Sequence, residues 1–155
     1  MSEHERYMQF ALTLAREAGE DGEAPVGCVI ISAEGKLIGS GRNRREKEKK
    51  ATAHAEIEAI SKACEVLGDW RLDGCSLYVT LEPCPMCAGA IIMSRVSKVF
   101  YGAKDALTGS CGSVTNLFME PYNHSTHIIG DVLASECSAL LSDFFKNLRG
   151  SGEPK

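Results

Sequence analysis

The stretch "CSLYVTLEPCPMCAGAIIMSR", residues 75–95, passes from a strand pattern to a helix pattern at a proline. Residues 75–81 are mostly apolar, with aromatic and β-branched side chains that are typical of a buried strand. After Pro83, residues 84–94 have the small and apolar side chains of a packed helix. A strand that leads directly into a helix is the building unit of an α/β sheet, and functional sites form where such strands end and helices begin.

The rest of the chain repeats this alternation of strand and helix patterns. Apolar runs rich in β-branched residues predict further strands, and apolar residues at helical spacing predict further helices. Thr52 is expected to cap the second helix, and Gly68 to end it. We therefore expect an α/β fold with three layers, α/β/α: a five-stranded mixed sheet, largely parallel after its first hairpin, with helices on both faces. The further strands are expected at 24–32, 37–43, 97–102 and 126–132, and the further helices at 3–19, 52–67, 112–119 and 135–148.

The size and charge of the chain restrict its class. A length of 155 residues with 44% hydrophobic residues fits one domain with a real core. We expect this domain to span residues 1–149, with residues 150–155 as a flexible tail. A net charge of −4 argues against a general nucleic-acid binder, because non-specific binding depends on Lys and Arg at phosphates. The basic segment 42–50 is expected to be a solvated loop.

The seven cysteines are odd in number, which argues against a complete set of disulfide bridges. Residues 1–10 have no signal-peptide pattern, and no apolar run has membrane-spanning length. We therefore expect a cytoplasmic chain whose cysteines pack in the core or bind metal. Cys28, Cys64 and Cys75 lie in apolar segments and are expected to be core residues. His4 is expected to be exposed and without a partner.

Two short motifs contain residues that could bind a metal. "TAHAE" contains His54 and Glu56, and "PCPMC" contains Cys84 and Cys87. C-x-x-C alone could be a redox pair or half of a structural zinc site, but a redox pair leaves no role for the histidine and glutamate. Both motifs lie at predicted helix starts. If the site lies beyond the helix ends, first-turn residues two positions apart can reach it from two sides.

One imidazole and two thiolates form a donor set that favours zinc. Three protein ligands leave the fourth position for water, which is typical of catalytic zinc. Glu56 is therefore predicted to move protons rather than to bind the ion. The alternative is a structural site with a fourth protein ligand, which could be Cys111, Cys137, His124 or His127.

H-x-E followed by P-C-x-x-C is the signature of the zinc deaminases, and the chain resembles the cytidine deaminase-like superfamily over about residues 5–149. Within it, the chain most closely resembles the bacterial tRNA-specific adenosine deaminases. The resemblance is strongest in "APVGCVI", "TAHAEIEAI", "GDWRLDGCSLYVTLEPCPMCAGAIIMSR", "YGAKDALTGSCGS" and "LLSDFFKNLR". It implies the fold of that superfamily, one Zn²⁺ in each subunit, a cytoplasmic homodimer, and the anticodon stem-loop of a tRNA as partner.

The resemblance also implies a reaction and a set of roles. Adenosine at the wobble position would become inosine, with attack at C6 and with Glu56 protonating N1 and assisting the departure of ammonia. Val26 and the His54 ring would sandwich the base, Asn43 would hold its edge or ribose, and the backbone at Ala55 would read the base. The residues implied to contact neighbouring nucleotides are Lys104, Asp105, Asn123, Phe145 and Arg149.

Two positions depart from the family pattern. Ala51 stands where proline is common, which would loosen the loop that enters the helix. Ser125 stands where arginine is common, which removes a possible phosphate contact and would affect affinity rather than chemistry.

Two other functions fit the motifs. A free-base or nucleoside deaminase, such as guanine deaminase, has the same zinc motif, and only "DALTG" and "FFKNLR" favour the tRNA enzyme. A non-catalytic binding module stabilised by zinc is the second alternative, but it has no use for the carboxylate of Glu56.

Overall fold

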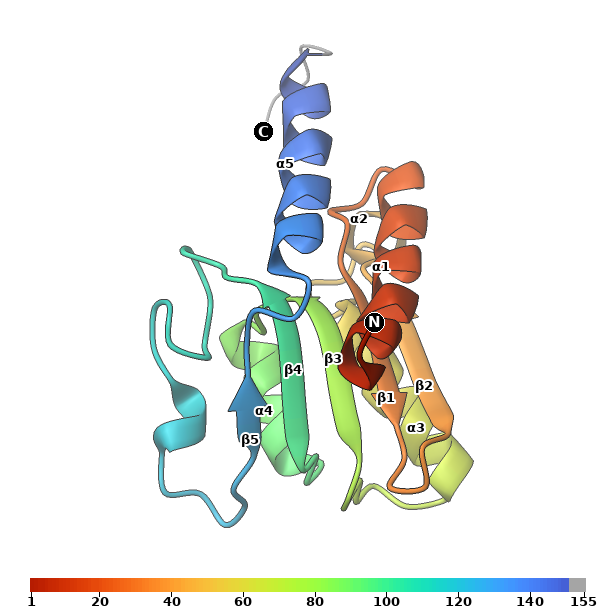
Figure 1. The fold of residues 1–155 in the computed structure, drawn as a ribbon, viewed down its shortest axis with the longest axis vertical. Coiled ribbons are helices and arrows are strands. Elements are labelled where there is room, and N and C mark those ends of the chain that lie inside the picture. Colours follow the sequence, from red (N-terminus) through yellow and green to blue (C-terminus); the bar gives the residue numbers. More distant parts are fainter. Residues whose placement is uncertain (151–155) are drawn as a thin grey trace.

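A five-stranded mixed sheet lies at the centre of the computed structural model, which describes residues 1–150 without the side chains of residues 149 and 150 (Figure 1). The strand order is β2-β1-β3-β4-β5. β1 pairs antiparallel with both β2 and β3, whereas β3, β4 and β5 run parallel. The strands are β1 (Gly27–Ile31), β2 (Leu37–Arg42), β3 (Ser76–Leu81), β4 (Lys98–Ala103) and β5 (His127–Ile129).

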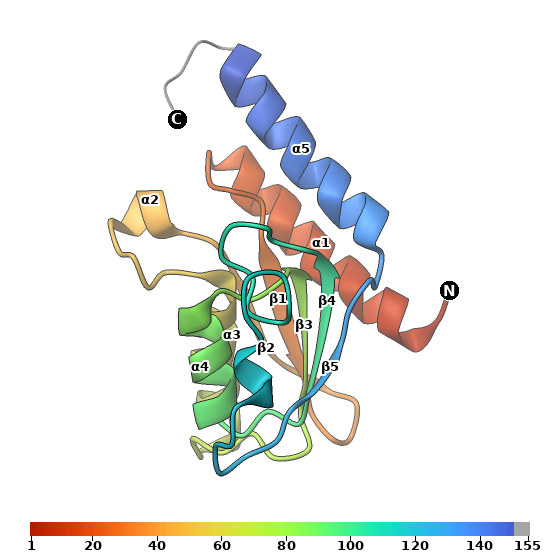
Figure 2. The ribbon, with the colours of Figure 1, turned by 90° about the vertical axis from the view of Figure 1, so that its left-hand side faces the viewer.

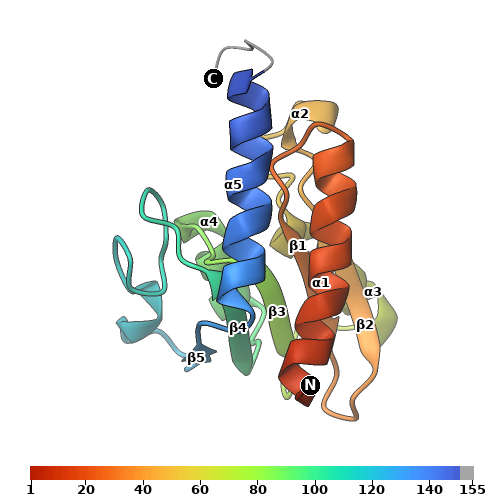
Figure 3. The ribbon, with the colours of Figure 1, turned by 45° about the horizontal axis from the view of Figure 1, so that its top comes forward.

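Helices cover both faces of this sheet. The helices are α1 (Glu3–Glu20), α2 (Arg45–Glu48), α3 (Ala55–Leu67), α4 (Pro85–Met93), the 3-10 turn η1 (Leu117–Met119) and α5 (Ala134–Gly150). α3 and α4 lie on one face and α1 and α5 on the other (Figure 2). α5 lies beside α1 and extends past the edge of the sheet (Figure 3). The predicted three-layer α/β/α fold is confirmed.

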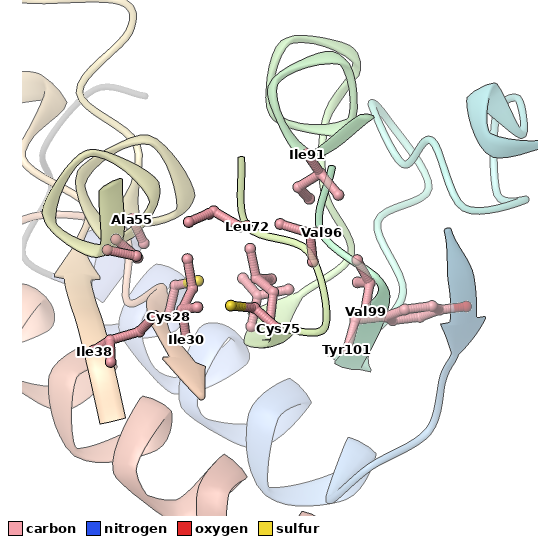
Figure 4. Packing of buried hydrophobic residues seen from close by; sticks show 14 residues of the cluster. Cys28, Ile30, Ile38, Ala55, Leu72, Cys75, Ile91, Val96, Val99 and Tyr101 are labelled. Carbon is pink, nitrogen blue, oxygen red and sulfur yellow. The ribbon is translucent and has the colours of Figure 1, made fainter. Parts of the chain in front are cut away.

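The two cores follow from the alternation of side chains along the strands. On β1, Cys28 and Ile30 are buried toward α3, whereas Val29 and Ile31 are buried toward α1. A run that is apolar at every position suits a strand covered on both faces. Figure 4 shows the core beneath α3 and α4, which contains Ala55 of α3, Ile91 of α4 and the thiol of Cys75.

Glycines on β2 let α3 lie very close to the sheet. A Cβ at Gly41 would be 2.8 Å from Cβ of Glu58 and 2.9 Å from the backbone nitrogen of Ala59, and closer still to the carbonyl oxygen of Ala55. These atoms belong to the first turns of α3. The absence of a side chain at Gly41 therefore determines where α3 begins relative to the sheet.

Four local predictions are wrong. The helix expected over 112–119 is reduced to the 3-10 turn η1. The N-cap of α3 is His54 and not Thr52. Segment 42–50 is not a plain loop: it contains α2, because the buried carboxylate of Glu23 accepts hydrogen bonds from two of its backbone N–H groups, at 3.0 and 2.7 Å. His4 is exposed as expected, but it has partners: its Nδ1 lies 2.7 Å from the Tyr78 hydroxyl, and its ring stacks on that of Phe100.

Ser2 and Glu5 form the capping box at the start of α1. The tail predicted over residues 150–155 lies, from residue 151 on, outside the described residues. No helix in the described part of the chain has the length and apolar character needed to cross a membrane.

Candidate active site

The side chains of His54, Cys84 and Cys87 meet between the starts of α3 and α4. Their donor atoms all lie within 4.8 Å of one another. Nδ1 of His54 is 3.7 Å from Sγ of Cys84 and 3.5 Å from Sγ of Cys87. The predicted convergence of the three residues is therefore present in the structure.

The local backbone explains how two helix ends hold these groups. His54 and Cys84 are the N-cap residues of α3 and α4, both with extended backbone, and neither side chain caps its own helix. Their imidazole and thiol are thus free to point beyond the helix ends. The free N–H groups and the dipole at each N-terminus favour negative charge there, and therefore favour thiolates. Glu56 lies in the first turn of α3 and reaches the same region.

The geometry fits zinc. Ligand distances of about 2.0–2.1 Å for nitrogen and 2.3 Å for sulfur place tetrahedral donors roughly 3.6 Å apart, and the two measured separations agree with that value. Within the described residues, the cluster of potential ligands contains a histidine and two cysteines and no fourth side chain. This matches a catalytic rather than a structural zinc site.

The proposed fourth ligands lie elsewhere or have other partners. Cys137 is buried in the core beneath α1 and α5, on the opposite face of the sheet. Nε2 of His124 lies 2.7 Å from the carbonyl oxygen of Val96, and His127 is exposed on β5. Cys111 is half-buried and packs against the core beneath α3 and α4. The alternative of a fourth protein ligand has no support among these residues.

The charges of the four groups depend on one another. Burial raises the pKa of Glu56 to about 7, so this carboxyl can both accept and donate a proton near neutral pH. A hydrogen bond from Cys87, together with one involving His54, lowers the pKa of Cys84 to about 4. The same pairing with Cys84, reinforced by burial, raises the pKa of Cys87, and the hydrogen bond with Cys84 raises the pKa of His54. In the metal-free protein the thiol of Cys84 therefore loses its proton more readily than that of Cys87, and zinc binding would release the remaining thiol protons.

A pocket of about 150 Å³ opens beside this cluster, about the volume that holds one aromatic ring. Its lining contains four of the predicted substrate-binding residues, Val26, Asn43, Ala55 and Asp105, together with His54, Glu56 and Cys84. Asn43 is buried and held in place, because its amide nitrogen donates to the carbonyl oxygen of Ala24 and its oxygen accepts from the backbone of Arg45.

Three predicted substrate contacts with described side chains do not line this pocket. Lys104 borders a separate depression with Tyr101 and Cys111. Asn123 is exposed in the loop before β5, and Phe145 lies on α5 with its ring edge against Phe144. The side chain of Arg149 is outside the described part of the structure.

Sequence reasoning missed five residues that line the pocket: Ala24, Arg45, Leu81, Glu82 and Thr108. Two of them had a recognisable signal. Glu82 directly precedes the P-C-x-x-C motif, and Thr108 lies inside the "DALTG" segment. Arg45 was missed because segment 42–50 was expected to be a solvated loop. Arg45 begins α2 there and lines the pocket.

The chain matches a known protein family and a curated relative. Residues 1–103 match the family model of the cytidine and deoxycytidylate deaminase zinc-binding region. A relative from Bacillus subtilis (strain 168), named tRNA-specific adenosine deaminase, is 47% identical over 96% of this chain and 92% of its own length.

Two solved structures superpose on this chain. A structure from work on A-to-I editing by tRNA:A34 deaminases at the wobble position of transfer RNA superposes with a TM-score of 0.84 at 42% identity, covering 88% of this chain and 99% of the other. A guanine deaminase from Bacillus subtilis superposes with a TM-score of 0.64 at 35% identity, covering 97% and 95%.

Proposed function

This chain belongs to the zinc-binding cytidine and deoxycytidylate deaminase family and, within it, to the tRNA-specific adenosine deaminases, and we propose that it converts adenosine to inosine at the wobble position of a tRNA anticodon. The meeting of His54, Cys84 and Cys87 beside the buried carboxylate of Glu56, next to a pocket of ring size, supports zinc-dependent deamination of a base. The 47% identity to a tRNA-specific adenosine deaminase over nearly the whole chain supports the choice of substrate.

His54, Cys84 and Cys87 would hold one Zn²⁺, and zinc supplies a water of lowered pKa as the nucleophile for C6 of the base. Glu56 accepts a proton from that water and delivers it to N1. Glu56 would then take the remaining proton of the attacking water, now on the oxygen bonded to C6, and deliver it to the departing amino group. The C6–O bond forms, the C6–N bond breaks, and water and adenosine yield inosine and ammonia. Burial, which raises the pKa of this carboxyl, favours its protonated form and suits it to pass protons on.

The residues around the pocket orient the base. Val26 and the ring of His54 flank it, and Asn43, whose amide is already fixed by two hydrogen bonds, holds its edge or ribose. The backbone at Ala55 reads the base from the first turn of α3. Asp105 forms one wall, where it also accepts hydrogen bonds from the loop that follows it.

Recognition of the rest of the RNA requires contacts outside the pocket. Lys104, Asn123, Phe145 and Arg149 meet neighbouring nucleotides, which are splayed out of the anticodon loop. A groove beside His54 is lined by Arg42, Arg44 and Lys50, but also by Glu48 and Glu58. Arg42 is ion-paired with Asp21 and Arg44 with Glu58, so contacts of this groove with phosphates would require these arginines to exchange partners. The absence of arginine at Ser125 and of proline at Ala51 weakens affinity without affecting the chemistry.

Three broader features complete the proposal. Residues 1–149 form a single deaminase domain. The chain acts as a homodimer that packs through α4, a helix of small and apolar residues whose Met93 is 69% exposed. It acts in the cytoplasm, where its tRNA substrates are found.

Substrate choice tests the proposal. We expect inosine to form on an anticodon stem-loop whose wobble position is adenosine, with little turnover of free guanine, adenosine or cytidine under the same conditions. The control is the same stem-loop with guanosine at the wobble position. Turnover of free guanine alone would assign the chain to the guanine deaminases instead.

A further inference from the structure

Glu82 is a buried carboxylate between the metal-binding motif and the loop that closes the pocket. It is 2% exposed, follows β3, and stands two residues before Cys84. Both of its oxygens accept hydrogen bonds from the loop of residues 105–113. Oε1 accepts from the backbone N–H of Asp105 at 3.0 Å, and Oε2 accepts from those of Cys111 and Ser113 at 2.9 and 3.1 Å.

A fourth hydrogen bond comes from the hydroxyl of Ser113 to Oε1. The loop also contacts the carboxylate at Gly109, where a Cβ would overlap the Glu82 carboxyl group and the carbonyl oxygen of Asp105. The backbone of residues 105–113 is therefore wrapped around one side chain. Several backbone N–H groups directed at one point form an anion-binding concavity, and here the anion belongs to the protein itself.

The same loop forms part of the pocket lining. Asp105 and Thr108 line the pocket, and they are joined by a bond from the Thr108 hydroxyl to the Asp105 carboxylate at 2.8 Å. The backbone N–H of Ser110 donates to the carbonyl oxygen of Pro83 at 2.9 Å, which ties the loop to the residue before Cys84. Glu82 thus connects the wall of the pocket to the segment that carries two of the zinc ligands.

We propose that Glu82 is a positioning residue for deamination: its carboxylate holds loop 105–113 in the shape that presents Asp105 and Thr108 to the substrate. This inference rests on the proposed function. The carboxylate is required because it only accepts hydrogen bonds, whereas the amide of glutamine would direct an NH₂ group at backbone N–H groups. Without the hydrogen bonds between the Glu82 carboxylate and the loop N–H groups, the wall of the pocket becomes mobile. The zinc ligands and Glu56 stay in place.

The test compares Glu82→Gln with Asp69→Asn. Asp69 also accepts a hydrogen bond from a backbone N–H, that of Arg71, but it is exposed beyond the end of α3 and far from the pocket lining. A misplacement of about 1 Å costs on the order of 100-fold in rate, so Glu82→Gln should lower kcat/KM on the stem-loop by about that factor. Asp69→Asn should match the wild type.

Three further readouts separate positioning from a general loss of structure. In Glu82→Gln, hydrogen exchange should accelerate at the amides of residues 105, 111 and 113 and stay unchanged in β3 and β4, with zinc content retained. A fall in kcat matched by an equal fall in the fraction of folded, zinc-loaded enzyme would indicate lost enzyme and would overturn the proposal. Unchanged exchange in the loop, or kcat/KM equal to that of the wild type, would overturn it as well.

Ser113→Ala keeps the test decisive if Glu82→Gln fails to fold. This variant removes one hydrogen bond and leaves the carboxylate, so it should accelerate exchange in the same loop and lower kcat/KM by a smaller factor, with zinc bound. An unaffected loop in Ser113→Ala would contradict the proposal. Failure of the wild type to act on the stem-loop would refute the proposed function, whereas the exchange data would still report on the loop.

Discussion

Gly41→Ala should displace the helix that carries His54 and Glu56. Carbon atoms in contact lie roughly 3.5–4.0 Å apart, but the new Cβ would be 2.8 Å from Cβ of Glu58. α3 must therefore retreat by about 1 Å. Overpacking of this kind costs about 1–3 kcal/mol, and a displacement of about 1 Å at a reacting group costs on the order of 100-fold in rate.

Thermal unfolding and deamination kinetics measure the two effects. A cost of about 2 kcal/mol should lower Tm by roughly 4–8 °C for a domain of this size. The matched control is Gly19→Ala in α1, where the new Cβ would meet Pro25 at an ordinary 3.6 Å; it should keep full activity and be as stable as the wild type or more so. Gly41→Ala with an unchanged Tm and full activity would refute the close packing of α3 on β2 as the determinant of site geometry.

The remaining predictions concern the thiols and the first helix. In the metal-free protein at pH 7, Cys84 should be a thiolate because its pKa is about 4, whereas the raised pKa of Cys87 keeps that thiol protonated. Brief treatment with iodoacetamide followed by mass spectrometry should label Cys84 first, and its labelling should slow as the pH falls toward 4; equal labelling of both thiols would contradict this. Ser2→Ala removes the capping box at α1 and should destabilise the protein by about 1 kcal/mol, measured by urea unfolding. Activity should not change. A lower kcat/KM for folded Ser2→Ala protein would argue against a purely structural role for the cap.

The parts of the fold that could be predicted depend on local patterns. The change from strand to helix near Pro83 is indicated by the types of consecutive residues alone. Gly68 ends α3 in the left-handed conformation, as expected. The zinc ligands were also predictable, because residues two or three apart at a helix start face the same end. His54 proved to be the N-cap itself, and this places its ring beyond the helix even more directly than a first-turn position would.

The parts that could not be predicted depend on partners far away in the sequence. α2 forms because Glu23 accepts its N–H groups from 23 and 24 residues away. Glu82 looks like an ordinary acidic residue until the loop ending at Ser113, 31 residues later, folds around it. His4 likewise finds Tyr78 across 74 residues. Hydrogen bonds of this range leave no periodic trace in the sequence.

Replacement of the proton-carrying carboxylate tests the central claim most directly. Glu56→Ala should fold and retain one zinc per chain, because Glu56 is outside the donor cluster. Its rate of inosine formation on the anticodon stem-loop should fall by about 10²–10⁴-fold, the usual contribution of a general acid–base. A variant that binds zinc and forms inosine at the wild-type rate would contradict the account.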